Sequence, residues 1–340
     1  MLLYTIMLFS SIMFASLFAA SSAVSSVGTR FNDWIVVHDV DIHNDAHYVS
    51  TMNTWYDNDV FLTDFNNNDN NTHRLGHNQF SGMTTDEFRS YLGRSYRKVG
   101  YRHVSIGHSI LRGADSSVNW VDSGGVTPVK NQGQCGSCWS FSTTGSLEGA
   151  YFVKTGTLSS FSEQQLVDCD RRIHGGSNSG CNGGLMDNAL KWIGSNGGLC
   201  LEDEYPYYSG DTKDWGTCAT TCTPVSDSTV TSVVDVPPAD DEQMMRAITQ
   251  QPVSVAIQAD TREFQLYESG VFTGTCGTGL DHGVLAVGYG SDDGSDYYLI
   301  KNSWGTTWGD QGFIKLAKGS SYNDGNGQCG VLMQASYPVL

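Results

Sequence analysis

The sequence predicts an α+β fold in which helices precede strands, and three observations support it. The 340 residues are 39% hydrophobic and only 16% charged, so the chain buries a core and is not disordered. Apolar residues recur at helical spacing over 185–193, before a run of small and polar residues stops them. After about residue 225 the pattern changes to short β-prone runs at 253–257, 284–289, 297–301 and 312–317.

The chain begins with an apolar run at 1–23 that contains no charged residue and ends in small residues. This composition predicts a signal peptide, cleaved near residues 20–23, and entry into the secretory pathway. An uncleaved anchor is the alternative, because the usual basic residues before the apolar run are missing and the run is nearly long enough to span a bilayer.

Charge and cysteine content divide the rest of the chain near residue 113. The net charge is -17, and most of the acidic excess follows that residue, with 11 basic and 26 acidic side chains. Binding of phosphate groups requires clustered Lys and Arg, so we expect no nucleic acid partner. All nine cysteines follow residue 113, whereas seven of the nine histidines precede it. The two parts are therefore expected to have different tasks.

Nine cysteines in an oxidising compartment predict disulfides, and the odd number leaves one cysteine outside them. The best candidate is Cys138, because a glycine-containing run at 131–136 leads into a predicted helix over 138–154 that stops at Gly156. The amide groups at a helix N-terminus favour a thiolate, which is a nucleophile. The alternatives are a redox pair of Cys135 with Cys138, or half of a zinc site. Only two histidines follow residue 113, so we expect no metal.

A thiolate that attacks an acyl group needs a base that can also protonate a leaving amine, and histidine suits this role. His174 lies in a polar, glycine-rich loop that offers nothing to hold an imidazole, so we interpret it as a solvated residue. His282 begins an apolar, β-prone run and is the better candidate. Asn302 ends a predicted strand and can orient the imidazole, and Trp304 can shield that hydrogen bond from water.

These segments together resemble the papain-type cysteine proteases, in particular the cathepsin-L-like endopeptidases. The matching runs occur in the family's order over nearly all of the C-terminal part: 132–142, SEQQLVDCD at 162–170, CNGG at 181–184, EYPY at 204–207, QPVSV at 251–255, 281–290 and 302–313. The resemblance implies a papain-like two-domain fold, with a helical left lobe, an antiparallel β-barrel right lobe and the site between them. It also implies an inactive zymogen made of a signal peptide, an N-terminal helical inhibitory propeptide and a papain-like peptidase domain, over 1–23, 24–113 and 114–340.

The resemblance assigns a mechanism residue by residue and implies no cofactor. Cys138 attacks the peptide carbonyl, and His282 protonates the leaving amine and then activates water. Asn302 orients His282. The side-chain amide of Gln132 and the backbone amide of Cys138 form the oxyanion hole. Trp304 shields the hydrogen bond between His282 and Asn302, and Trp308 packs behind it.

The resemblance also implies which residues bind a protein or peptide substrate: Gly183, Gly184, Leu185, Met186, Ala256, Leu280, Asp281, Trp304 and Gln334. Most side chains around the pocket for the second residue before the scissile bond are apolar, which suits Leu, Phe or Val. Gln334 lies at the floor of this pocket or points to solvent. The segment between Cys169 and Cys181 is too short for a large occluding loop, so we expect an endopeptidase.

Family positions imply the disulfide pairs, with one ambiguity. Cys135 pairs with Cys181 and Cys276 with Cys329. Cys169 pairs with either Cys218 or Cys222, and Cys200 takes whichever of the two remains. We further expect a monomer in a lysosome or outside the cell, with its own propeptide and cystatin-type inhibitors as partners.

The segment before residue 114 resembles the family's inhibitory propeptide with some positions altered. Its helix matches at Trp55, Asn58, Leu62 and Asn66, and a second motif matches at Gly76, Asn78 and Phe80, with Gly82 in place of its closing Asp. His47 and Thr51 replace an expected Glu and Arg, so that ion pair is missing. With histidines this frequent, we hypothesise that protonation of buried imidazoles such as His47 or His77 destabilises the propeptide in acid.

Overall fold

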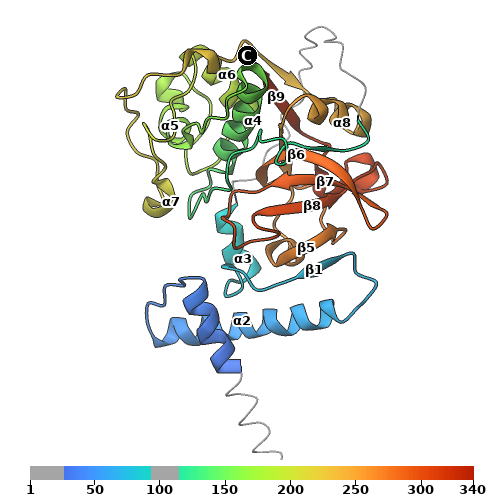
Figure 1. Cartoon of the computed structure of the whole chain (residues 1–340). Helices are drawn as coiled ribbons and strands as arrows, with labels where there is room; N and C mark the ends of the chain where they lie inside the picture. The colour runs from blue at the N-terminus through green and yellow to red at the C-terminus, as the bar shows by residue number, and fades with distance from the viewer. Residues whose placement is uncertain (1–26, 93–114) are drawn as a thin grey trace, which may run out of the picture.

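The computed structural model describes residues 27–92 and 115–340 in three bodies. Figure 1 shows the N-terminal segment as crossed helices at the bottom, a helical lobe at the upper left and a sheet lobe at the right. The predicted signal peptide and the predicted junction at 113/114 lie outside the described residues. None of the helices in the described ranges is long and apolar enough to cross a membrane.

The chain order agrees with the predicted order of helices and strands. An unlabelled first helix covers 27–37. The other α-helices are α2 (Asp45–Asn66), α3 (Thr85–Phe88), α4 (Cys138–Thr155), α5 (Glu163–Cys169), α6 (Met186–Asn196), α7 (Ser209–Thr212), α8 (Asp241–Gln250) and α9 (Arg262–Gln265). The strands are β1 (His73–Leu75), β2 (Val118–Asn119), β3 (Ser232–Asp235), β4 (Val253–Ile257), β5 (Tyr267–Phe272), β6 (His282–Asp292), β7 (Ser295–Lys301), β8 (Phe313–Ala317) and β9 (Ala335–Val339).

Helix α4 is the centre of the helical lobe and confirms the prediction for this segment. It begins at Cys138 and ends where Gly156 adopts a left-handed conformation at φ 75°, which favours glycine. Two glycines let the helix approach the sheet lobe closely. A Cβ at Gly145 would lie 2.7 Å from the Leu285 side chain, and one at Gly149 would lie 2.4 Å from Pro252. The central helix therefore presses directly against β6 and the start of β4.

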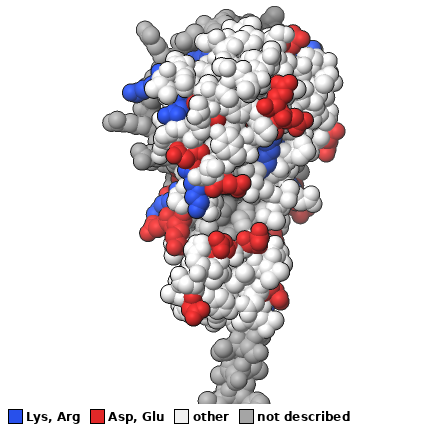
Figure 2. Space-filling view, turned by 90° about the vertical axis from the view of Figure 1, so that its left-hand side faces the viewer, with Lys and Arg blue, Asp and Glu red and all other residues white. Residues whose placement is uncertain are grey.

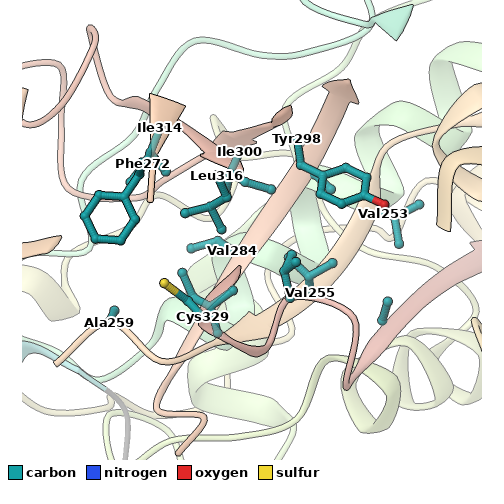
Figure 3. Close-up of a cluster of buried hydrophobic side chains, with 14 of the residues drawn as sticks. Val253, Val255, Ala259, Phe272, Val284, Tyr298, Ile300, Ile314, Leu316 and Cys329 are labelled. Atoms are coloured by element: carbon teal, nitrogen blue, oxygen red, sulfur yellow. The ribbon is translucent and has the colours of Figure 1, made fainter. Parts of the chain in front are cut away.

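The sheet lobe is built on one hydrogen-bonded path of strands in the order β1-β5-β8-β7-β6-β4-β9-β3, with β2 added to β6. The pairs are antiparallel, as predicted, except that β5 and β8 run parallel. Apolar side chains from several strands fill the interior, as Figure 3 shows for Val255, Phe272, Val284, Ile300 and Leu316. This packing holds β6, which begins at His282, and β7, which ends just before Asn302, in a rigid frame.

Four disulfides join the eight cysteines other than Cys138. Cys135 pairs with Cys181 and Cys276 with Cys329, as the resemblance implies. The structure also decides the ambiguous pairs, which are Cys169–Cys218 and Cys200–Cys222. Three of the bonds fasten loops of the helical lobe. The described residues contain no group of three or more side chains that could hold a metal ion.

The N-terminal segment has a small aromatic core of its own. Phe31, Trp34 and Trp55 pack together where the first helix crosses α2. The ion pair expected between positions 47 and 51 is absent, but a different one joins the two helices, since Arg30 lies 2.6 Å from Asp59. His47 is only partly buried, whereas His77 stacks on Trp55 with ring centroids 4.4 Å apart and lies 3.1 Å from Asp59.

This segment docks on the sheet lobe through strand pairing and polar contacts. Strand β1 pairs antiparallel with β5, so the sheet continues into the N-terminal segment, as Figure 1 shows at the bottom of the sheet lobe. The Asn78 side chain donates to the Gln265 carbonyl at 2.9 Å, and the Arg262 guanidinium donates to Asn58 at 2.8 Å. The match of Asn58 and Asn78 to the family's motifs therefore reflects contacts with the sheet lobe.

Candidate active site

Cys138 lies at the first position of α4, where helix geometry leaves backbone amide groups without partners inside the helix. The sulfur is fully buried. One turn along the helix, the Ser142 hydroxyl donates to the Val284 carbonyl at 2.6 Å. That bond fixes the helix against β6 close to His282, which begins the same strand. The two lobes thus bring the cysteine and the histidine to one place.

The geometry around His282 defines its tautomer. Its Nε2 lies 2.8 Å from Oδ1 of Asn302. The backbone N–H of Ser303 donates to the same Oδ1 at 2.8 Å, so this atom is the amide oxygen and Nε2 of His282 must carry the proton. Nδ1 is buried, has no hydrogen-bond partner among the described atoms and is left unprotonated in the neutral ring. Because burial disfavours the charged form, the pKa of His282 falls to about 4 in this state.

Trp304 covers this hydrogen bond and Trp308 packs behind Trp304, as the sequence analysis expects. The Trp304 ring stacks on His282 with centroids 4.5 Å apart and an interplanar angle of 20°. Trp308 meets Trp304 edge-on at 4.9 Å. Both indoles are buried, so water does not compete for the bond between His282 and Asn302.

Asp281 precedes His282 and interacts electrostatically with both His282 and Cys138. Its Oδ1 accepts a hydrogen bond from the Ala259 amide at 2.8 Å. Burial is the main cause that raises the pKa of Asp281 to about 7, and the nearby Asp260 carboxylate raises it further. The charge of this carboxyl therefore changes within the neutral pH range.

Gln132 occupies a fixed position beside the start of α4. Its Oε1 accepts from the Ser303 hydroxyl at 2.7 Å, which turns Nε2 in the opposite direction. Nε2 donates to the Cys135 carbonyl and to the Tyr91 carbonyl, both at 3.0 Å. Tyr91 belongs to the N-terminal segment, so a carbonyl of that segment lies at the amide that the sequence assigns to an oxyanion.

Other residues of the N-terminal segment cover the same region. Phe80 and Phe88 each meet the Trp304 ring edge-on with centroids 5.3 Å apart. The Gln79 side chain donates to the Trp304 carbonyl at 2.6 Å. Since Trp304 in turn stacks on His282, the propeptide helps to keep that ring buried. Sequence reasoning found Phe80 as a motif residue but did not identify its contact with Trp304.

The predicted substrate pocket is partly assembled. Met186, Ala256 and Leu280 are buried in one hydrophobic cluster, so the structure brings these three together. Leu185 is partly exposed and immediately precedes α6. Gln334 is half-buried, and its backbone carbonyl accepts from the Ala256 amide at 3.0 Å, which places it beside the cluster.

Both glycines of the CNGG run are required by the structure. Gly183 has φ 98°, which favours glycine. A Cβ on Gly184 would lie 2.6 Å from the Trp139 ring and 2.7 Å from the Asn178 side chain. Sequence reasoning missed Asn178, whose Oδ1 accepts from the Leu185 amide at 2.8 Å and whose Nδ2 donates to Asp170 at 2.6 Å. Asn178 thereby fixes the backbone that follows the two glycines.

A buried ionic cluster between the lobes was also missed. Lys130 lies 2.6 Å from Glu163 and 3.5 Å from Glu148, and the Lys301 ammonium donates to the Thr127 carbonyl at 2.7 Å. Burial raises the pKa of Glu163, which the nearby Lys130 ammonium opposes, and burial lowers the pKa of Lys301 to about 8. Lys301 immediately precedes Asn302, so this cluster supports the strand end that orients the histidine.

His174 lies away from these residues. It ends a short 3-10 helix, Arg172–His174, and is exposed. The structure therefore places it as the solvated loop residue that the sequence analysis describes.

Comparison with known proteins assigns this fold and site to a family. Residues 114–339 match the model of the papain family cysteine protease, and residues 31–88 match the cathepsin propeptide inhibitor domain (I29). These matches are those of a cysteine protease with its own inhibitory segment. The chain belongs to the papain family. More particularly, it is a papain-like cysteine endopeptidase, similar to plant cathepsin-L-like enzymes and made as a zymogen with a propeptide.

Several relatives are similar over most of their length. Cysteine endopeptidase RepA of Oryza sativa subsp. japonica is 43% identical over 308 residues, which are 87% of this chain and 79% of RepA. The senescence-specific cysteine protease SAG39 of Oryza sativa is 41% identical over 325 residues, which are 93% of this chain and 91% of SAG39. The solved structure titled recombinant stem bromelain precursor has a TM-score of 0.82 at 35% identity, over 93% of this chain and 99% of that one.

Proposed function

We propose that Cys138 and His282 are the catalytic pair of this endopeptidase. The single observation that carries the proposal is the ring state of His282. Its Nε2–H is held by Asn302, and the unprotonated Nδ1 is left for the thiol proton. Transfer of that proton makes a thiolate at the N-terminus of α4, where the helix dipole stabilises negative charge.

The thiolate attacks the substrate carbonyl and forms a tetrahedral intermediate whose oxygen accepts from Gln132 Nε2 and the Cys138 amide. His282 then returns its proton to the leaving amine, and the peptide after the scissile bond departs. In the second half, His282 removes a proton from water, and the resulting hydroxide attacks the acyl-enzyme and releases Cys138. Asp281 lies beside both members of the pair and interacts with their charges.

For substrate choice, the cluster of Met186, Ala256 and Leu280 favours an apolar residue at the second position before the scissile bond. Gly183, Gly184 and Leu185 hold the substrate backbone as an added strand. In the zymogen the propeptide blocks this cleft, because the Tyr91 carbonyl accepts a hydrogen bond from Gln132 and Phe88 packs on Trp304.

The boundaries 1–23, 24–113 and 114–340 remain part of the proposal. Four disulfides and the papain family support passage through the secretory pathway, to a vacuole, a lysosome or the exterior. Proteins are the substrates and the propeptide is the inhibitor in cis. A monomeric enzyme and binding of cystatin-type inhibitors complete the proposal.

The test is hydrolysis of a fluorogenic peptide with Leu or Phe at the second position before the cleaved amide. We expect activity in the processed enzyme, inhibition by a thiol-reactive epoxide, and no turnover by Cys138→Ala. His282→Ala should lose comparable activity and His174→Ala almost none, since a nucleophile and its base act as a unit. Equal losses at the two histidines would contradict the assignment.

A further inference from the structure

The propeptide places a positively charged side chain against a carboxylate of the peptidase domain. Nε of Arg89 donates to Oδ2 of Asp260 at 3.1 Å. Arg89 begins the 3-10 helix Arg89–Tyr91, and the carbonyl of Tyr91 accepts from Gln132. The arginine and the carbonyl at the proposed oxyanion site thus come from one short segment. Asp260 therefore binds a propeptide side chain beside the proposed site, and the propeptide's own Asp86, 2.6 Å from Nη1 of Arg89, shares that side chain.

Asp260 lies on the wall that carries His282. Strand β4 pairs with β6 so that Ile257 is opposite His282, and Asp260 follows three positions later. The intervening Ala259 donates to Asp281, the neighbour of His282. Since His282 protonates the leaving amine in the proposed mechanism, the departing peptide begins on this wall. Asp260 is consequently positioned beside residues after the scissile bond.

The neighbouring side chains leave one carboxylate oxygen of Asp260 available to bind a cation. Its Oδ1 accepts from the Gln258 amide at 2.8 Å, which orients the carboxylate, and its side chain is 22% exposed. In the described residues its only ion-pair partner is Arg89. Arg262, two positions further on, is directed to the propeptide instead, where it donates to Asn58 and lies over the Phe61 ring. Removal of the propeptide takes away Arg89 and exposes the carboxylate.

Figure 2 shows acidic side chains scattered over one face of the molecule, with fewer basic ones among them. The C-terminal part has 26 acidic and 11 basic residues, so a basic substrate is attracted to the enzyme in general. Because Gln258 holds the Asp260 carboxylate in one orientation, this residue can attract a basic side chain at one defined place.

We propose that Asp260 selects a basic side chain, Arg or Lys, in the part of the substrate that follows the scissile bond. This inference rests on the proposed function. In the zymogen Arg89 satisfies the same carboxylate, so propeptide and substrate compete for Asp260 as well as for Gln132.

The test compares internally quenched peptides that share every residue before the scissile bond, with Leu at the second position. Arg or Gln is placed in turn at each of the first three positions after the bond, and mass spectrometry identifies the cleaved bond. The measured quantity is the ratio of kcat/KM for the Arg peptide to that for the Gln peptide. The ratio cancels any change that affects both peptides equally.

We expect the wild-type enzyme to favour Arg about fivefold at one of these positions, the size of a partly exposed charge pair. Asp260→Asn should reduce the ratio to about one, and Asp260→Lys should favour a Glu peptide over Gln. The matched control Asp296→Asn removes another exposed carboxylate, in β7, and should keep the ratio. Raising the salt concentration should weaken the preference, because an exposed pair is screened.

Two failures are distinguishable. If the wild-type enzyme cleaves neither peptide, the proposed function fails. If it cleaves both equally at all three positions, or if Asp260→Asn keeps the wild-type ratio, the role of Asp260 is wrong. Equal cleavage is also the result expected if Arg262 turns to Asp260 after the propeptide leaves.

Discussion

The side-chain amide of Gln132 donates a 3.0 Å hydrogen bond to the backbone carbonyl of Tyr91. The donor belongs to the peptidase domain and the acceptor to its propeptide. The propeptide therefore binds the amide that we propose as an oxyanion donor of the enzyme. A buried amide that would otherwise lack this partner is satisfied, which stabilises the inhibited state.

Replacement of Gln132 by Ala should lower kcat by roughly a hundredfold and leave KM nearly unchanged, because the lost donor stabilises the oxyanion rather than the bound substrate. Steady-state kinetics on the processed enzyme measure both constants. An effect confined to KM would remove Gln132 from the oxyanion hole.

Replacement of Asp281 by Asn should move the pH profile of kcat/KM. The carboxylate raises the pKa of His282, and its interaction with Cys138 disfavours a second negative charge there. Its removal should therefore lower the pKa of both groups, so that the acid and the alkaline limbs shift to lower pH. Glu242→Gln, an exposed acid on α8, is the control. Unchanged limbs in Asp281→Asn would mean that the carboxyl is uncharged during catalysis.

A buried histidine at the joint between propeptide and enzyme should make docking sensitive to acid. His73 in β1 is 4% exposed, lies between Phe65 and Phe272, and has no hydrogen-bond partner at either ring nitrogen among the described atoms. Burial lowers its pKa from 6.5 to about 4. The docked state thus binds fewer protons than the released one, and docking weakens as pH falls from about 6.5 towards about 4.

The charged group facing His73 is Glu263 of α9, with Nε2 and Oε2 3.7 Å apart. Burial raises the pKa of Glu263, so its charge is itself diminished in acid and offsets the cost only in part. His73→Phe should keep the packing, and the rate of zymogen conversion should rise less steeply between about pH 6.5 and 4.5. His47→Gln, at a partly exposed site, should behave as wild type. Identical pH dependence in all three proteins would assign the acid response to other groups.

Replacement of Gln334 by Glu should increase cleavage of substrates that have Arg at the second position before the scissile bond. The new carboxylate would lie beside the apolar cluster that includes Ala256, where a charge is poorly screened by water. The ratio of kcat/KM for Arg and Phe peptides measures the change. An unchanged ratio would show that the side chain points away from the pocket.

Local signals explain what the sequence predicts well. The limits of α4 follow from the glycine-containing run before Cys138 and from the left-handed Gly156, and β4 has the predicted limits because its apolar run is continuous. Both features depend on neighbouring residues. The residues themselves indicate His282 as the base for Cys138, but its place on a second lobe packed against the first was implied only by the family resemblance.

Several contacts between distant residues have no signal in the sequence. β1 has three residues and pairs with a strand almost two hundred positions later, which no periodicity reveals. Asn178 appears in the sequence as one more polar loop residue, although its amide fixes Leu185 and holds Asp170. The ion pair between Arg30 and Asp59 takes the place of the missing pair at positions 47 and 51. It links the first helix to α2, and the two charges meet only because these helices cross.

The pairing of β1 with β5 has a consequence for the enzyme after activation. Loss of the propeptide strips one neighbour from Tyr267–Phe272, and the peptide groups along that side are then open to solvent. An exposed edge strand of this kind can pair with any extended chain, including the same edge strand of a second copy. Glu268, the exposed second residue of this strand, places a negative charge there and opposes self-association by repulsion. Replacement of Glu268 by Gln would remove this charge and make concentrated active enzyme more prone to associate along that edge strand.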